Sequence, residues 1–320
     1  MSAALAAGCT IIVKSASLTP LTSSIMVEAV NAAGFPPGVI NLLHTSDSAG
    51  LTGALMSDPR IQKVSFTGST VVGVSLLQQA ATHVTSSSME LGGNGAFIVL
   101  RDADIASTVQ QAVAAKYRNS GQVCVAANRF ILEEDIADEF IEQFVQQTAA
   151  LTVGHGLDRD TGMGPLITAA QRDRVIEWIG RSVAAGSHIR LGGTPLDRPG
   201  YFLEPTVIEA SGLDDPLAQE EIFGPVAVMY RVESAAEAVK FANRTPYGLA
   251  AYVFTGDVGR GLTVAAALDS GVVGINRVGV TEPAAPFGGV KASGLGREGG
   301  EDSILEFMEE QYVALARTDI

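Results

Sequence analysis

The sequence is poor in cysteine. Only two cysteines occur in 320 residues, and neither lies in a Cys-x-x-Cys pair or in a Cys/His cluster with the spacing of metal ligands. Two such residues cannot build a disulfide framework, and we predict no metal site. The expected setting is therefore a reducing cytoplasm.

Basic residues are also scarce. Lys and Arg total 21 against 35 Asp and Glu, which leaves a formal net charge of −14 at pH 7. Non-specific binding to nucleic acid or to an anionic membrane surface needs a basic surface. We therefore expect neither nucleic acid nor a membrane as a partner.

Long apolar runs are lacking as well. Residues 2–13, "SAALAAGCTIIV", are apolar, but the run is too short to span a bilayer and no basic segment precedes it, although "LAAGC" resembles a lipoprotein cleavage site. We interpret this stretch as a buried strand that carries Cys9 as a structural thiol. Because the chain then opens within a structural element, we expect that a portion is missing upstream.

What is present describes a globular chain of about two domains, with 47% hydrophobic and 18% charged residues. Short apolar runs alternate with helical stretches, which is typical of parallel βαβ units. A glycine pair near residues 92–97 separates a first series of elements from a second. The predicted strands are 9–14, 39–44, 61–68, 84–93, 95–100, 129–134, 249–256, 270–277 and 311–317, and the predicted helices are 19–34, 48–58, 70–83, 102–119, 134–151 and 234–245.

Cys124 lies among small and polar residues in "YRNSGQVCVAANRF" (117–130). A free cysteine taken alone is more often a buried structural thiol. Here the small neighbours leave room for a substrate, and "NSGQ" suggests that Cys124 stands at a helix start, where backbone N–H groups and the helix dipole would stabilise a thiolate. Cys124 is therefore a candidate nucleophile.

Glu90 ends an apolar strand in "MELGGNG", and a carboxylate beside apolar walls has a raised pKa and can accept a proton near neutrality. An isolated glutamate at a strand end is more often simply solvated. In "VSFTGSTVVG" (64–73), a strand, Gly68, Ser69 and a helix follow one another, an arrangement that can receive a phosphate. This is not the G-x-G-x-x-G pattern, and glycine turns before helices are common.

Five motifs taken together resemble the aldehyde dehydrogenase superfamily, most closely its succinate-semialdehyde dehydrogenase branch. They occur in the family's order and spacing, and "ALAAGCTIIVKSASLTP" resembles its cofactor-binding strand. The motifs are "VSFTGST" (64–70), "MELGGN" (89–94), "GQVCVAANRF" (121–130), "EEIFGPV" (220–226) and "PFGGVKASGLGREG" (286–299).

The resemblance implies an α/β fold: a partial Rossmann-type cofactor domain (1–92), an α/β catalytic domain (93–292), and a segment (293–320) that returns to the cofactor domain and ends in an oligomerisation strand. That strand, 311–317, has nothing left to pair with in its own chain, which suggests a homo-oligomer, a dimer or a tetramer.

The resemblance also implies a mechanism. The Cys124 thiolate adds to an aldehyde, the thiohemiacetal gives a hydride to nicotinamide, and Glu90 activates the water that hydrolyses the thioester. Glu221 and Phe223 match the residues that hold the nicotinamide ribose and ring, for which a surface charge and core packing are the plainer interpretations. The remaining implied cofactor contacts are Phe66, Gly68, Ser69, Leu91 and Gly92.

Charge bears on the choice of cofactor. Lys14 matches the family lysine that contacts the adenosine ribose, and Ser17 stands where many NAD-dependent members carry Glu. A glutamate there would repel a 2′-phosphate, whereas Ser with Lys tolerates one. We therefore predict that NADP is preferred and NAD is second; a role of Ser17 as the cap of the following helix is the alternative.

Substrate identity depends on Arg118, which matches the arginine that pairs with the far carboxylate of succinate semialdehyde in this branch. Its plainer interpretation is a surface arginine. Glu282 and Pro283 stand where polar sequence is usual, and a carboxylate there would repel the substrate. Ala126 replaces the second cysteine of some members, so we predict no disulfide switch in this loop.

Family members have a longer N-terminal portion, which includes an Asn that donates to the oxyanion beside the Cys124 N–H. Loss of such a donor costs about 10²–10³ in kcat. Three hypotheses therefore stand: an aldehyde dehydrogenase sequence, a non-catalytic remnant that assembles with a full-length homologue, and a cofactor-independent thiol esterase that uses Cys124 and Glu90.

Overall fold

A seven-stranded sheet forms the larger part of the protein, in a computed structural model that describes residues 1–316. The strand order is β11-β10-β5-β6-β9-β8-β7, parallel except for the antiparallel pair β7 and β8. The strands are β5 (Gly95–Val99), β6 (Ala127–Glu133), β7 (His188–Leu191), β8 (Thr206–Glu209), β9 (Val226–Val232), β10 (Ala250–Phe254) and β11 (Val272–Ile275).

Helices cover both faces of this sheet. Apolar side chains of α5 (Ile105–Tyr117) and α6 (Glu134–Ala149) pack on one face, against Phe97 and Phe130 among others. Those of α7 (Ala169–Ala184), α8 (Ala235–Asn243) and α9 (Val258–Ala266) pack on the other. Because both faces are covered, β5, β6 and β10 are buried along their whole length. The sequences of β5 and β10 are continuous apolar runs, whereas β6 also buries Asn128, Arg129 and Glu133.

Two smaller sheets form the rest. Strands β1 (Ile11–Lys14) and β2 (Ile40–Leu43) pair in parallel, as do β3 (Lys63–Thr67) and β4 (Ser86–Glu90); β12 (Gly294–Leu295) joins β4 antiparallel. Between them run α2 (Pro20–Ala32), α3 (Ser48–Met56) and α4 (Thr70–Ala80). The side chains of Asp47 and Ser69 cap α3 and α4.

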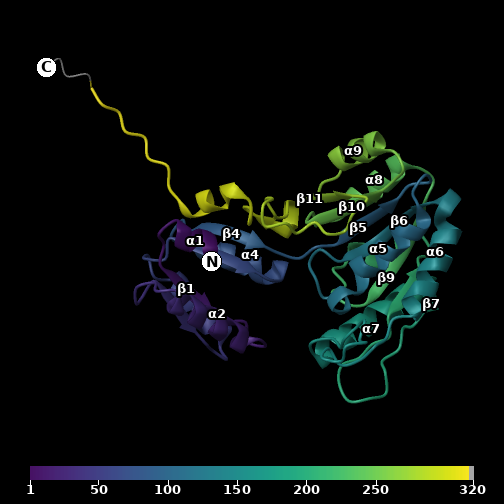
Figure 1. Ribbon diagram of the computed structural model, residues 1–320, viewed down its shortest axis with the longest axis horizontal. Helices are drawn as coiled ribbons and strands as arrows, with labels where there is room; N and C mark the ends of the chain where they lie inside the picture. Colours follow the sequence, from purple (N-terminus) through teal and green to yellow (C-terminus); the bar gives the residue numbers. More distant parts are fainter. Residues whose placement is uncertain (317–320) are drawn as a thin grey trace.

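Residues 91–94 connect the smaller sheets to the larger one, since β4 ends at Glu90 and β5 begins at Gly95. Figure 1 shows this link running from the blue β4 toward the seven-stranded sheet, with the C-terminal segment passing back over it. The C-terminal segment includes η3 (Lys291–Ser293) and η4 (Glu301–Phe307), and η4 packs beside α1 (Ser2–Ala6).

The predicted fold class is confirmed: the elements alternate, and the larger sheet is mostly parallel. The three-segment division of the chain stays a prediction. The sequence patterns did not predict helices α7 and α9 or strands β7, β8 and β9. Strands β7 and β8 are only four residues long, and all three strands lie at one end of the sheet order.

Both ends of the described chain differ from expectation. Residues 2–6 form a helix rather than a buried strand, and Cys9 lies in the turn before β1, half-buried, with its thiol donating to the Phe307 carbonyl at 3.6 Å. Alanine favours helix, and Gly8, with φ 81°, turns the chain before the strand.

The predicted C-terminal strand is also absent over the described part. Residues 308–316 form no strand and leave the body of the molecule, while residue 317 of the predicted range lies outside the described residues (Figure 1).

Within residues 1–316, no helix is long and apolar enough to cross a membrane. Over the same range, no group of three His, Cys, Asp or Glu side chains could hold a metal ion.

Candidate active site

Cys124 lies in a turn between η1 (Arg118–Gly121) and β6. The expectation that it begins a helix is therefore wrong, because the chain goes from this turn directly into a strand. Burial raises the pKa of the thiol, and the charges of Glu221 and then Glu90 add to that rise, while the backbone N–H groups of Cys124 and Val125 oppose it. Burial and the two carboxylates therefore favour the protonated form of the thiol.

The loop before Cys124 is backbone-strained. Asn119, Ser120 and Gly121 follow one another with φ of 52°, 59° and 71°, a left-handed conformation that costs roughly 1–2 kcal/mol per non-glycine residue. The Ser120 hydroxyl donates to the Gly164 carbonyl at 2.8 Å, and Gln122 Oε1 accepts from the Ile167 N–H at 2.9 Å. These hydrogen bonds hold the loop in a backbone conformation that the local sequence does not predict.

Glu90 is buried at the end of β4, with a relative exposure of 6%, although the strand before it holds three serines and Met89. Burial raises its pKa to about 8, with a further rise from Glu298 and a partial opposition from Arg297. Its Oε2 atom has no hydrogen-bond partner among the described residues. A buried carboxyl group with one oxygen unpaired is suited to exchange a proton with a water molecule.

Glu221 reaches across from the segment before β9. Its Oε1 accepts from the Gly93 N–H at 2.9 Å, and a Cβ on Gly92 would lie 2.4 Å from its Oε2. Burial raises the pKa of Glu221, and the Gly93 hydrogen bond opposes that rise. The carboxylate therefore lies directly against the backbone of the glycine pair, which only glycine at position 92 permits.

Phe223, in the same segment, adopts a left-handed backbone with φ 47°. The Gln171 side chain of α7 donates to its carbonyl at 3.0 Å and to that of Ile222 at 3.2 Å. A Cβ on Gly121 would lie 2.1 Å from the Gly224 carbonyl oxygen, so the backbone of this segment touches the Cys124 loop. Gln171 had carried no sequence signal, because its role is to bind main-chain groups.

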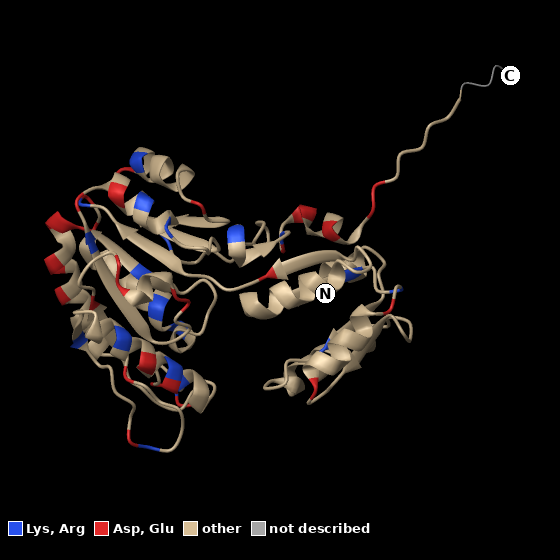
Figure 2. Ribbon diagram, turned by 180° about the vertical axis from the view of Figure 1, so that it is seen from behind, with Lys and Arg blue, Asp and Glu red and all other residues tan. Residues whose placement is uncertain are grey.

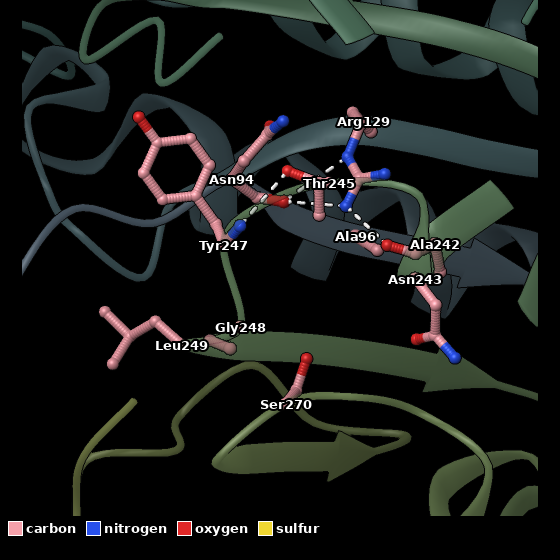
Figure 3. A pocket seen from close by; sticks show the side chains of 11 residues that line it. Asn94, Ala96, Arg129, Ala242, Asn243, Thr245, Tyr247, Gly248, Leu249 and Ser270 are labelled. Atoms are coloured by element: carbon pink, nitrogen blue, oxygen red, sulfur yellow. Dashed lines mark hydrogen bonds between the residues drawn. The ribbon is translucent and has the colours of Figure 1, made fainter. Parts of the chain in front are cut away.

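A buried arginine, Arg129, binds the carbonyl of Asn94, the residue that follows the glycine pair (Figure 3). The Arg129 guanidinium donates to the carbonyls of Asn94, Phe241 and Ala242, and burial lowers its pKa to about 10. Asn94 Nδ2 donates to the Ala218 carbonyl at 2.9 Å. These bonds anchor the link between the two sheets beside the thiol.

Lys14 and Ser17 both contact Ser48. Lys14 Nζ donates to the Ser48 hydroxyl at 3.2 Å, and the hydroxyls of Ser17 and Ser48 are 3.3 Å apart. Ser17 does not cap the following helix, whose N-cap residue is Thr19. Ser48, at the start of α3, is a third member of this cluster that sequence reasoning missed.

The "VSFTGST" residues form a turn at the start of α4. Gly68 packs against the Phe66 ring, Ser69 Oγ accepts from the Val72 N–H at 3.5 Å, and the first turn holds no acidic residue. Leu91 is buried against Gly73 in the core below this turn. The first-turn amides and the Ser69 hydroxyl are groups of the kind that bind a phosphate.

Arg118 is exposed at the start of the Cys124 loop. It lies near the Tyr252 hydroxyl, which itself donates to the Val125 carbonyl at 2.6 Å. Burial holds the pKa of Tyr252 above its ordinary value, and Arg118 opposes this. Glu282 is exposed on the loop after β11.

The structure thus gathers Cys124, Glu90, Glu221 and the glycine pair into one centre at the junction of the sheets. Lys14, Ser17 and Ser48 lie apart from it, on the small β1-β2 unit. Tyr252, whose hydroxyl donates to the Val125 carbonyl, had looked like a core strand residue in the sequence, and pattern alone could not single it out.

Comparisons with known proteins agree with this geometry. A family model described as "Aldehyde dehydrogenase family" matches residues 1–313. A succinate-semialdehyde dehydrogenase of Paenarthrobacter nicotinovorans is 46% identical over 313 residues, covering 98% of this chain and 70% of the relative. A glutarate-semialdehyde dehydrogenase of Pseudomonas putida is 40% identical, covering 98% of this chain and 65% of the relative.

Among solved structures, that of an E. coli NADP-dependent enzyme superposes with a TM-score of 0.94 at 41% identity, covering 96% of this chain and 64% of the other. The chain therefore spans about two thirds of the length of the proteins that it matches.

Proposed function

Because the chain belongs to the aldehyde dehydrogenase family, we propose that it oxidises a short aldehyde that carries a carboxylate, succinate semialdehyde first, to the corresponding acid. The observation that supports this most is the convergence of a half-buried thiol, a buried carboxyl group and Glu221 on one glycine pair.

The Cys124 sulfur, once ionised, adds to the aldehyde carbon and forms a thiohemiacetal. The N–H groups of Cys124 and Val125 face the sulfur, and the Cys124 N–H is the donor proposed for the developing oxyanion. Once the thiohemiacetal has lost a hydride and its hydroxyl proton to become a thioester, the ionised form of Glu90 takes a proton from water. The hydroxide attacks the thioester carbon, and the C–S bond breaks to release the acid and the thiolate.

The residues of the cofactor side suit a phosphorylated dinucleotide. Lys14, Ser17 and Ser48 form a cluster of one ammonium and two hydroxyl groups, and the first turn of α4 carries no acidic side chain that would repel a phosphate. When bound, NADP supplies the hydride acceptor that turns the thiohemiacetal into a thioester. Glu221 and Phe223 are the residues proposed to hold its nicotinamide end, with NAD as the weaker cofactor.

Arg118 is proposed to recognise the far carboxylate of the substrate, because it is exposed beside the Cys124 loop. The names of the relatives point to more than one aldehyde acid, and Glu282 would disfavour any anion that approaches it. A longer acid such as glutarate semialdehyde is therefore the nearest competitor as substrate.

The C-terminal segment supports a further proposal, a homo-oligomer in which 308–316 pairs with another copy. Tyr312, Val313 and Leu315 are 91%, 72% and 94% exposed. The C-terminal segment that holds them runs away from the body of the molecule (Figure 1). Light scattering of the full chain and of a variant that ends at Phe307 tests this: we expect a dimer or tetramer that dissociates on truncation, and a monomer in both cases would contradict it.

NADPH absorbance measured with succinate semialdehyde, glutarate semialdehyde and propanal tests the function. We expect turnover that requires NADP and is faster with the two acids. Arg118→Ala should raise KM for the acids about tenfold or more, as loss of a charge-assisted pair does, and leave KM for propanal unchanged. An equal change for all three aldehydes would contradict the assignment of Arg118.

A further inference from the structure

Lys116, in the last turn of α5, is a buried lysine that the proposed mechanism does not use. It belongs to a buried row of the helix, with Thr108 and Ala112 at the preceding two positions of a four-residue spacing. Its side chain is fully buried, and lysine is almost never fully buried unless it is paired. The inward row of an amphipathic helix predicts an apolar residue here, so the lysine requires a reason of its own.

One hydrogen bond accounts for the amine. Lys116 Nζ donates to Asn128 Oδ1 at 2.8 Å, and both residues are buried. Over residues 1–316 the amine has no ion-pair partner, and burial alone lowers its pKa to about 7. Amine and ammonium both carry N–H groups, so the bond to Asn128 forms in either state. A methionine would fill the same space without the desolvation of a charge, so stability alone does not explain the pair.

The two partners stand at the two ends of the segment that carries Cys124. Lys116 precedes this segment on α5 and Asn128 follows it on β6, so residues 117–127 lie between them. The Lys116 main chain also touches the segment, because a Cβ on Gly121 would lie 3.2 Å from the Lys116 carbonyl oxygen. The hydrogen bond therefore joins the two ends of segment 117–127.

Strand β6 connects this bond to the rest of the candidate site. Neighbouring residues of a strand point to opposite faces of the sheet, so Asn128 shares the α5 face with Phe130, and Arg129 points to the other face. There Arg129 donates to the carbonyl of Asn94, the residue that follows the glycine pair. Two successive residues of β6 thus hold the Cys124 segment on one face and the glycine link on the other.

Resting on the function proposed above, we propose that Lys116 is a positioning residue for the nucleophile. Its hydrogen bond to Asn128 closes the segment that carries Cys124 and fixes where the sulfur lies relative to the glycine pair and Glu90. The left-handed turn of η1 is strained, and such a turn persists only where its surroundings hold it. The bond between α5 and β6 supplies that restraint at the ends of the segment.

Turnover and stability of three variants test this role. Lys116→Met removes the donor and keeps a long unbranched side chain, Asn128→Leu removes the acceptor, and the double variant replaces both partners by apolar groups. The matched control is Ser187→Ala, which loses a buried hydrogen bond to Asp215 of 2.6 Å beside β7, at the edge of the sheet. NADPH formation from succinate semialdehyde gives kcat and KM, and urea unfolding gives the midpoint.

We expect each single variant to lower the urea midpoint, because one buried partner loses its hydrogen bond, and the double variant to restore it. In all three, kcat should fall by about tenfold to a hundredfold, the effect of a small misplacement of a reacting atom, while KM changes by less than about twofold. Ser187→Ala should lower the midpoint and keep the wild-type kcat. A double variant that recovers kcat together with the midpoint, or a Lys116→Met protein with the wild-type kcat, overturns the inference.

Failure of the proposed function gives a different result. If the wild type forms no NADPH, hydrogen–deuterium exchange of the peptide that spans residues 117–127 decides the role of the pair. Faster exchange of this peptide in the double variant than in the wild type and in Ser187→Ala supports the inference. Equal exchange in all three proteins overturns it.

Discussion

The seven-stranded sheet and the smaller β1–β4 unit differ in how completely they are built. The strands β5, β6 and β10 are buried throughout, between helices on both faces. The β1–β4 unit instead exposes large apolar side chains to solvent, among them Leu18, Leu21, Ile25, Val71 and Val84 at 66%, 75%, 67%, 81% and 90% exposure.

Charge follows the same division. Residues 1–92 hold only seven charged side chains, and this part is almost wholly tan in Figure 2, whereas charged residues line the helices around the large sheet. The seven are Lys14, Glu28, Asp47, Asp58, Arg60, Lys63 and Glu90. An apolar and weakly charged surface of this kind is typical of a face that contacts another protein part or a ligand.

This difference in packing indicates which residues of the proposed site are held rigidly. Cys124 and Arg129 are held by a closed core, which fixes the thiol loop and the glycine pair. The contacts proposed for the adenosine and phosphate end of the dinucleotide, Lys14, Ser17 and Ser69, lie on the β1–β4 unit, whereas Glu221 and Phe223 belong to the segment before β9. Glu90 and Glu221 lie at the junction, so the proposed reaction depends on how the β1–β4 unit packs against the seven-stranded sheet.

The largest expected effect compares the two cysteines, one in each region. Cys124→Ala should abolish NADPH formation, because no other thiol lies at the junction. Cys9→Ala should keep most of the activity, since Cys9 makes one weak contact to Phe307 far from the site. Steady-state rates with succinate semialdehyde measure both, and equal losses would remove the distinction between the regions.

Glu90→Gln is expected to lower turnover by about 10²–10⁴, the range for loss of a general base. Its first turnover should persist, because the thiol and the dinucleotide contacts are unchanged, so that a burst of NADPH precedes a slow steady state. Rapid-mixing absorbance separates the two phases. A burst that disappears along with turnover would place Glu90 in the earlier step instead.

The next comparison concerns how much an apolar side chain of each region contributes to the stability of the protein. Phe97→Ala should destabilise the protein by about 3–5 kcal/mol, since Phe97 is fully buried among Phe130, Tyr252 and Phe254. Ile12→Ala, at a side chain 43% exposed on β1, should cost less than about 1 kcal/mol. Urea unfolding of both variants measures the two losses of stability. Equal losses would mean that the β1–β4 unit is packed as tightly as the seven-stranded sheet.

Glu90 also links stability to pH. Its pKa is about 8 in the folded protein against 4.5 ordinarily, so the folded state holds the extra proton between these values. The stability that this carboxyl group contributes is full below pH 4.5 and is lost as the pH rises through about 8. Glu90→Gln should therefore gain on the wild type, by on the order of 1–3 kcal/mol between pH 5 and pH 9, in denaturant titrations. A constant difference would show that Glu90 is not buried in solution.

The smallest expected effect is a change in cofactor preference, from a substitution on the β1–β4 unit. Ser17→Glu should shift the ratio of kcat/KM for NADP over NAD toward NAD by roughly tenfold, about 1.4 kcal/mol, because the new carboxylate would repel a 2′-phosphate. Ser48→Ala removes a neighbouring hydroxyl without adding charge and serves as the control. An unchanged ratio in Ser17→Glu would place the phosphate elsewhere.

The sequence could predict the fold class and the central residues because both leave local patterns. Alternating apolar runs indicate parallel units, and five motifs in order carry the family. Glu90 was expected at the end of a strand with a raised pKa, and the structure places it at the end of β4, where burial raises its pKa, although three of the five strand residues are serines.

Other features depend on contacts between distant segments. The left-handed turn at Asn119 and Ser120 replaces the helix start expected at Cys124, because Gly164 and Ile167, which hold it, lie some 40 residues away along the chain. Ala-rich residues 2–6 turned from a predicted strand into a helix, since apolar composition without alternation does not distinguish the two. The Glu221 contact to Gly93 spans 128 residues and has no local signature.

The central claim is that Cys124 carries the substrate as a thioester that Glu90 helps to hydrolyse. The most direct test mixes Glu90→Gln with NADP and succinate semialdehyde, quenches in acid, and maps the peptides by mass spectrometry. The account predicts an acyl group on the peptide that contains Cys124 and on no other. NADPH formation with that peptide unmodified would contradict it.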